Sequence, residues 1–395
     1  MSGGQNRRLS ARRASVSSNV PPPHCLPSHD RPISSLLAAP AENAARQTLC
    51  WRIEYQLADA ELSIIRCSGI FSAGGLIMLN QILKQLADGG FHSGESLGEA
   101  LGVSRAAVWK QLKKLDELDI PYSSVKGKGY RLHDAIELLD DQRIQAALQQ
   151  RLDRLEILLD VPSTNTYLFD RAKDYMGQRY AVLAEKQSQG RGRRGRRWVS
   201  PFGKNIYLSL LVSFAGGLQA LEGLSLVTAI AVERALGRLG IADIGLKWPN
   251  DVYAGGKKLA GILLEVTGEY NSHCQVVIGI GLNLSLSEQD AADIDQPWAE
   301  LRSLKPGLSR NQVASVLLDE LLTVVDEFQR SGFAPFQQYW CERDVFAERE
   351  VRIVGPKEEL QGVVKGVNRK GELMLRTERG METITAGEIS VRIAD

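Results

Sequence analysis

Residues 190–198 hold the densest group of ligand-binding side chains in the chain. Five arginines and three glycines stand in these nine residues, although the formal net charge of all 395 residues is only +1. An arginine fork binds carboxylate or phosphate through paired hydrogen bonds, and glycine lets backbone N–H groups approach an anion closely. Because arginines this close together repel one another, we expect a loop that an anionic ligand orders and that closes over a small polyanion.

The glycines of this loop also match a dinucleotide-binding pattern. Gly190, Gly192 and Gly195 spell G-x-G-x-x-G directly after a strand predicted at 180–185. A dinucleotide-binding loop must lead into a helix, whereas Trp198 and the proline and glycine that follow it disfavour one. A shaped anion site fits better than a dinucleotide fold, and also better than a plain basic tract for localisation or nucleic-acid binding.

Further segments that suit a ligand pocket accompany the predicted strands. They are Ser163-Thr164-Asn165 after a strand at 155–159, 247–251 (KWPND) at a strand end, 258–262 (KLAGI) within a strand at 257–265, and 279–283 (GIGLN), where small residues let a strand pass close to a ligand. A glycine hairpin precedes the strand at 257–265, a polar linker helix is expected at 138–152, and amphipathic helices are expected at 224–239 and 311–330. The pattern predicts an α+β domain with a mainly antiparallel sheet.

The preceding region predicts a winged helix-turn-helix. Helices are expected at 78–86, 97–101 and 105–118, with Ser93 or Ser96 and then Ser104 as N-caps, and a two-stranded wing at 123–132. The residues that we expect at DNA are Ser104, Arg105, Trp109, Lys110, Lys113 and Lys126, a mixed set suited to bases and phosphates. The alternative is a small helical packing module whose lysines are merely solvated.

Composition limits the other function classes. Charged residues make up 24% of the chain and nearly cancel, which argues against a general polyanion-binding protein. The five cysteines, Cys25, Cys50, Cys67, Cys274 and Cys341, show no CxxC spacing, so a reducing cytoplasm is expected and a disulfide framework is not. No apolar run approaches the length of a membrane span, and the isolated histidines suggest no metal site.

The two ends of the chain differ from its middle. Residues 1–77 are rich in arginine, serine and proline; we interpret them as a disordered extension or as sequence upstream of a true start at Met78, with a transit peptide as the alternative. After the helix at 311–330, short strands at 350–354, 360–367, 372–376, 381–385 and 389–393 alternate with glycine turns. These strands predict a small β domain, most simply a barrel.

The ordered motifs resemble those of biotin–protein ligases. The Ser163-Thr164-Asn165 triplet, the arginine loop and the KWPND, KLAGI and GIGLN segments occur in that family's order, and the winged helix adds similarity to its bifunctional ligase–repressors. The resemblance implies four parts: an extension (1–77), a winged helix-turn-helix (78–140), a catalytic domain similar to class II aminoacyl-tRNA synthetase cores (141–345) and an SH3-like barrel (346–395). It also implies ATP and Mg²⁺ as cofactors, and biotin as the substrate that is joined to a lysine of a biotin carboxyl carrier protein.

The resemblance also implies roles for individual residues. Arg193 and Lys247 are the expected catalytic cations beside the reacting carboxylate and phosphate. The positions implied to contact biotin or its adenylate are Ser163, Thr164, Asn165, Gln187, Gly190, Arg191, Gly192, Arg193, Trp198, Lys247, Gly261, Gly281, Asn283 and Trp298. No carboxylate cluster identifies ligands for Mg²⁺. The alternatives are that Ser163 is only a helix cap and that Lys247 is a solvated strand-end charge, while Trp248 fits the core better than the ligand.

Four hypotheses remain at this point. The chain is a ligase that also represses an operator as an adenylate-dependent homodimer, a ligase whose helix-turn-helix no longer represses, a regulator without ligase activity, or a lipoyl-transferring relative. The intact arginine loop and the winged helix disfavour the last. Biotinylation of a carrier domain in the presence of ATP separates the first two from the others.

Overall fold

The computed structural model describes residues 73–268, 273–355, 359–385 and 390–393. The first 72 residues, and with them most of the predicted extension and three of the cysteines, lie outside the described residues. In the part of the chain that is described, no helix is long and apolar enough to cross a membrane.

The N-terminal described region is a winged helix-turn-helix, as predicted. Its elements are helices α2 (Ala73–Leu86), α3 (Gly94–Leu101), α4 (Arg105–Leu112) and α5 (Lys114–Glu117), followed by antiparallel strands β1 (Tyr122–Val125) and β2 (Gly129–Leu132). Ser93 and Ser104 cap α3 and α4 through their side-chain oxygens. Between the two helices Gly102 takes a left-handed conformation (φ 65°), which glycine adopts without strain.

Two boundaries in this region differ from the prediction. Helix α2 begins at Ala73 rather than at Met78, and the single helix expected at 105–118 is divided between α4 and α5. The apolar spacing survives the division, because Val108, Leu112 and Leu115 are all fully buried. Side-chain periodicity therefore located the buried face correctly but not the ends of the helices.

A seven-stranded sheet forms the centre of the molecule, in the order β3-β4-β5-β9-β8-β7-β6. Its strands are β3 (Arg154–Val161), β4 (Tyr180–Gln187), β5 (Ile206–Ala215), β6 (Ile244–Lys247), β7 (Asp251–Ala254), β8 (Lys257–Gly268) and β9 (His273–Leu282). Only β3 and β4 pair in parallel, and the other neighbours are antiparallel. The predicted α+β domain with a mainly antiparallel sheet is confirmed.

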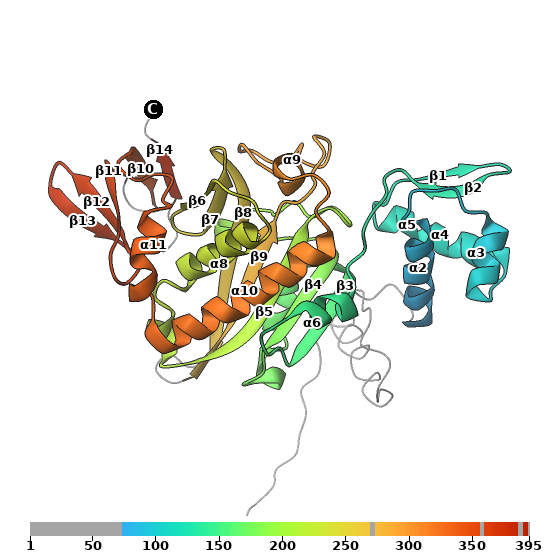
Figure 1. The fold of residues 1–395 in the computed structure, drawn as a ribbon, viewed down its shortest axis with the longest axis horizontal. Helices are drawn as coiled ribbons and strands as arrows, with labels where there is room; N and C mark the ends of the chain where they lie inside the picture. The colour runs from blue at the N-terminus through green and yellow to red at the C-terminus, as the bar shows by residue number, and fades with distance from the viewer. Residues whose placement is uncertain (1–72, 269–272, 356–358, 386–389, 394–395) are drawn as a thin grey trace, which may run out of the picture. The chain divides into compact units, whose positions relative to one another are not determined.

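Alternating side chains let helices cover both faces of this sheet. Along β4, Ala181 and Leu183 join the large core beneath α8 (Leu224–Arg238) and α10 (Arg310–Ser331), which lie together on one face (Figure 1). Tyr180 belongs to a smaller core on the other face, beneath α7 (Thr164–Phe169) and the 3-10 helix η1 (Ala172–Tyr175). Shorter elements complete the domain: α6 (Asp141–Ala147), η2 (Arg193–Gly195), η3 (Gly217–Leu221) and α9 (Leu301–Leu304).

Residues 137–140 run from the winged helix into the region of the seven-stranded sheet and are hydrogen-bonded to it. The Glu137 carboxylate accepts from the Arg310 backbone N–H at 2.6 Å, at the start of α10, and the Leu139 N–H donates to Glu185 at 2.6 Å. Glu185 and Arg310 form an ion pair in which both side chains are almost completely buried. The helix expected at 138–152 is shorter, because these contacts keep the chain extended until α6 begins at Asp141.

The C-terminal region is a five-stranded antiparallel sheet. It follows η4 (Ala334–Phe336) and α11 (Gln337–Cys341), and its strands are β10 (Glu350–Val354), β11 (Glu359–Val367), β12 (Leu373–Thr377), β13 (Gly380–Ile384) and β14 (Ser390–Ile393), in the order β13-β12-β11-β10-β14. The expected small β domain is confirmed. Its apolar face shares the large core of the central sheet, and the Trp248 indole donates to the Gly371 carbonyl at 3.0 Å.

Candidate active site

Two adjoining cavities lie where the arginine loop meets strands β8 and β9. The smaller has a volume of about 50 Å³ and the larger about 240 Å³. Three residues, Gly192, Trp198 and Lys258, line both cavities. Every predicted ligand-contacting residue except Gly190 lines one or both of these cavities, and the three shared residues mark the junction between them.

The smaller cavity is lined mainly by neutral polar groups and glycines. Ser163, Thr164 and Asn165, which cap and begin α7, are each only 4% exposed. The Gln187 side-chain oxygen, at the end of β4, accepts from the Thr164 backbone N–H at 2.9 Å and its hydroxyl at 3.1 Å. Ser163 also caps α7, so the two roles that the sequence left open are compatible.

Strand β9 approaches this cavity closely because it carries glycine there. A Cβ atom on Gly279 would lie 2.2 Å from the Asn165 side-chain oxygen, and one on Gly281 would lie 2.4 Å from the Trp198 ring. A Cβ atom on Gly261, in β8, would lie 3.0 Å from the same ring. The small residues predicted at these positions make room for the indole and the amide at the junction.

The arginine loop forms a tight hairpin between β4 and β5. The Trp198 N–H donates to the Gly190 carbonyl at 2.8 Å, and the Gly192 N–H donates to the Arg196 carbonyl at 2.7 Å. Protein carboxylates relieve part of the expected repulsion, because Arg191 pairs with Glu265 at 2.7 Å. The arginines also diverge: Arg191 lines the smaller cavity, and the other four line the larger one.

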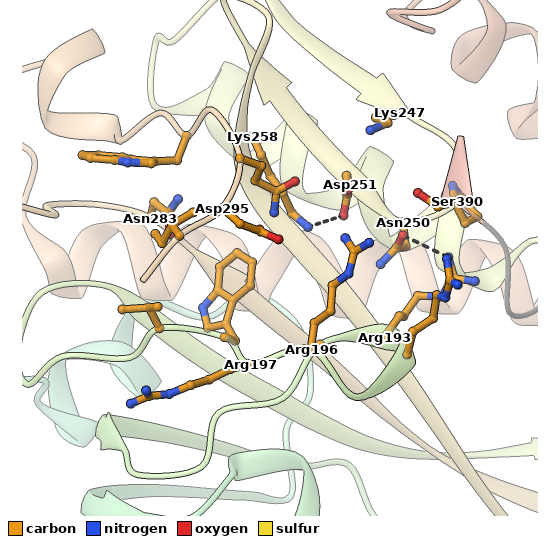
Figure 2. A pocket seen from close by; sticks show the side chains of 18 of the residues that line it. Arg193, Arg196, Arg197, Lys247, Asn250, Asp251, Lys258, Asn283, Asp295 and Ser390 are labelled. Carbon is orange, nitrogen blue, oxygen red and sulfur yellow. Dashed lines mark hydrogen bonds and ion pairs between the residues drawn. The ribbon is translucent and has the colours of Figure 1, made fainter. Parts of the chain in front are cut away.

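In the larger cavity Arg193 is the most enclosed of these arginines. Its guanidinium donates to the Asn250 side-chain oxygen at 3.1 Å, as Figure 2 shows. Burial lowers the pKa of Arg193, with the neighbouring Arg194 and Arg196 adding to the effect and Asp251 opposing it. Because Arg193 is partly buried, water screens its charge only weakly, so its attraction for an anion in this cavity is stronger than at the surface.

The two lysines of the site differ in position. Lys247 lines only the larger cavity, where its ammonium lies 3.0 Å from the Tyr253 hydroxyl and burial lowers its pKa. Lys258 stands at the junction, and its ammonium pairs with Asp251 at 2.8 Å (Figure 2). Lys258 begins the KLAGI segment but was not among the site residues expected from the sequence.

Asn283 and Trp298 both line the larger cavity. Asn283 is 4% exposed and donates to the Ala299 carbonyl at 3.1 Å. The loop of Trp298 is held to β8 because the Lys258 N–H donates to the Pro297 carbonyl at 3.0 Å. Their predicted contact with the adenylate stays a prediction, whereas the buried Trp248 is mainly a core residue.

The described residues contain no group of three histidine, cysteine, aspartate or glutamate side chains able to hold a metal ion. The larger cavity instead offers arginines and lysines beside three aspartates, Asp251, Asp293 and Asp295. Two of these aspartates are already paired, Asp251 with Lys258 and Asp293 with Arg197. This donor set fits a Mg²⁺ ion that is held chiefly by substrate phosphates.

The predicted DNA-binding side chains gather on α4 and the wing. Arg105, Trp109, Lys110, Lys113 and Lys126 are all exposed, and Ser104 caps α4. The Lys113 ammonium lies 3.9 Å from the centre of the Trp109 ring, a cation–π contact. Trp109 remains 51% exposed, so a large apolar surface is available beside the basic residues.

Three family models match consecutive parts of the chain. Residues 78–131 match the HTH domain, 159–283 the biotin/lipoate A/B protein ligase family, and 347–392 the biotin protein ligase C-terminal domain. Bifunctional ligase/repressor BirA of Salmonella typhimurium is 39% identical over 314 residues, which cover 80% of this chain and 97% of that protein. The Escherichia coli protein of the same name is 38% identical, again over 80% of this chain and 97% of its own length.

A solved structure shows the same fold. The biotin protein ligase from Aquifex aeolicus in complex with biotin and ATP matches with a TM-score of 0.53 and 28% identity, over 62% of this chain and all of that one. The family models match the winged helix, the central region that holds most of the lining of the two cavities, and the C-terminal sheet, in that order along the chain. The chain belongs to the biotin–protein ligase family, among its bifunctional ligase/repressors.

Proposed function

We propose that this biotin–protein ligase and repressor forms biotinyl-5′-adenylate at the junction of its two cavities. The single observation that carries the proposal is that Gly192, Trp198 and Lys258 line both cavities, so ligands in the two would meet there. A neutral polar cavity next to a cationic one suits the joining of an uncharged ring system to a polyphosphate through a shared carboxylate.

The smaller cavity is assigned to biotin's ureido ring. This ring needs neutral donors and acceptors, which Ser163, Thr164, Asn165 and Gln187 supply from a buried surface. The cavity is small, about 50 Å³, so Trp198 and its loop must shift when the ring and its side chain enter. The valeryl carboxylate would then reach Lys258.

The larger cavity is assigned to ATP. Arg193, assisted by Arg194 and Arg196, faces the phosphates, and Trp298 supports the adenine by stacking. Lys247 stands farther along this cavity, so we assign it to phosphate oxygens and give Lys258 the position between carboxylate and α-phosphate. Asn283 completes the wall at the nucleoside end.

The reaction follows from these positions in two steps. A biotin carboxylate oxygen attacks the α-phosphorus, the bond to the bridging oxygen breaks, and pyrophosphate leaves with the electron pair. Lys258 and Arg193 offset the charge that gathers between the two anions. A neutral lysine amine of the carrier then attacks the acyl carbon, AMP leaves, and the nitrogen loses its proton to give the amide. Mg²⁺, when bound, neutralises phosphate charge.

The partners and domain roles are part of the same proposal. The acceptor is a biotin carboxyl carrier protein of acetyl-CoA carboxylase, in the cytoplasm, and the five-stranded C-terminal sheet (domain 346–395) acts as an SH3-like barrel that supports nucleotide and carrier. The catalytic domain (141–345) resembles class II aminoacyl-tRNA synthetase cores. The adenylate orders the arginine loop, strengthens a homodimer and so raises the affinity of the winged helix (78–140) for operator DNA.

Two measurements test the proposal. Protein, ATP, Mg²⁺, biotin and a carrier domain are mixed, and the mass of the carrier is expected to rise by one biotinyl group; an unmodified carrier would overturn the ligase assignment. Binding to a biotin-operon DNA fragment is then measured with and without biotin plus ATP. Equal affinity in both conditions would refute the adenylate-dependent switch while leaving the ligase assignment intact.

A further inference from the structure

Glu265, on β8, contacts two residues of the smaller cavity but lies outside the predicted site. Both of its carboxylate oxygens accept from the Arg191 guanidinium, at 2.8 and 2.7 Å. One of them also accepts from the Asn165 side-chain amide at 3.0 Å. The Glu265 side chain is 22% exposed, so solvent screens these contacts only in part.

Glu265 also belongs to a circuit of polar contacts around the cavity, which the backbone of the arginine loop completes. Its members, in order, are Arg191, Glu265, Asn165, Ser209, Thr164, Gln187, Ser200 and the Trp198 carbonyl. Arg191 and Trp198 lie in the same loop, so the circuit begins and ends there. Apart from Arg191 and Glu265, the side chains in it are neutral, so Glu265 is its one anion.

This circuit fixes the orientation of the Asn165 amide. The amide nitrogen donates to the Leu263 carbonyl at 3.1 Å and to Glu265, while the amide oxygen accepts from the buried Ser209 hydroxyl at 2.6 Å. With both hydrogens engaged, Asn165 can offer a ligand only its oxygen. The oxygen of Asn165 is therefore presented to a donor such as a ureido N–H.

We propose that Glu265 is a positioning residue for biotin, which latches the arginine loop over the smaller cavity through Arg191 and holds the Asn165 amide in its acceptor orientation. The inference rests on the proposed function, because it takes the smaller cavity as the biotin site. It also changes the role of Arg191: this arginine closes the biotin cavity, and its charge is already matched by a protein carboxylate.

The neutral variant Glu265→Gln tests the contact with Arg191 while preserving the packing of the side chain. A glutamine keeps the size of the side chain and an oxygen that accepts from Asn165, but it cannot form the ion pair in which one Arg191 nitrogen contacts both carboxylate oxygens. Biotin is expected to dissociate about tenfold faster and its KM to rise about tenfold, the scale of one hydrogen bond to a charged group. The KM for ATP and kcat at saturating biotin are expected to stay within about twofold of wild type.

The matched control is Glu327→Gln, which breaks an ion pair with Arg234 (3.3 Å) whose residues line neither cavity. Arg191→Met removes the cation of the same ion pair. Arg191 is exposed in the loop, so this change leaves the core intact. The double variant Arg191→Met/Glu265→Gln is expected to bind biotin no more weakly than the weaker single variant, because the two changes break one interaction.

The outcomes distinguish the latch from the proposed function. Additive losses in the double variant, an unchanged biotin KM in Glu265→Gln, or a similar rise in the Glu327→Gln control would each overturn the latch while wild type still labels the carrier. Failure of the wild-type protein to label the carrier would instead refute the proposed function. Partial recovery of biotin affinity in Glu265→Asp, which restores the charge, would support the positioning role.

Discussion

Replacing Lys258 by methionine is the most direct test of the junction. The ammonium is 14% exposed and lies 2.8 Å from Asp251, so it acts in a poorly screened environment. Two unit charges about 4 Å apart attract by about 4 kcal/mol at an effective dielectric constant of 20. Because Asp251 already offsets part of the lysine charge, we expect a loss of about 3 kcal/mol in the transition state, or about a hundredfold in rate.

The assay follows single-turnover formation of biotinyl-adenylate from α-labelled ATP, before any carrier is added. Lys258→Met also leaves Asp251 without its ion-pair partner, which costs stability. The double variant Lys258→Met/Asp251→Asn is therefore expected to regain thermal stability but not rate. Lys247→Met is the matched comparison, and we expect it mainly to raise the KM for ATP. A rate within threefold of wild type in Lys258→Met, or a larger rate loss in Lys247→Met, would refute the assignment.

Four further changes follow from the structure. Gly281→Ala pushes a methyl group to 2.4 Å from the Trp198 ring, and calorimetry is expected to show biotin affinity reduced at least about tenfold. Arg193→Gly is expected to release the adenylate, seen as biotin on lysines of an unrelated protein. Lys113→Gln is expected to weaken operator binding and lower the slope of its salt dependence by about one, with ligase rate unchanged. Burial raises the pKa of Asp344 to about 6, above the 3.8 of the unfolded chain. The folded state therefore binds the extra proton, so the contribution of Asp344 to stability is greatest below about pH 4 and falls as pH rises to 6, by up to about 3 kcal/mol. Chemical denaturation across this range should show the free energy of unfolding of wild type falling relative to that of Asp344→Asn.

The sequence was sufficient for the parts of the site that depend on motif and local capping. Ser163 begins a helix because its side chain caps it, and a glycine-rich loop after a buried strand positions Arg193. The spacing of apolar residues also predicted which face of each helix is buried, as at Leu112. These features are determined by residues within about one turn or one hairpin of each other, which is the range that a local pattern covers.

The missed residues depend on how strands are paired. Lys257 and Lys258 are adjacent, and only the pairing of β7 with β8, which shifts register between Val252 and Tyr253, decides which of them faces the cavity. Glu265 stands at the end of a predicted strand, and its partners lie 74 and 100 residues away in sequence. Such roles need a three-dimensional register, which no spacing along the chain supplies.

The attachment of residues 137–140 determines where the DNA-reading module can be detached. The Glu137 carboxylate and carbonyl, and the Leu139 N–H, satisfy groups of α10 and Glu185 in the catalytic region. A ligase shortened to begin before Glu137 keeps these contacts, whereas one that begins after Asp140 leaves the buried Arg310 short of an acceptor. The winged helix can thus be removed while residues 137–140 stay with the ligase region. Any protein fused in place of the winged helix would be joined at the same point, just before Glu137.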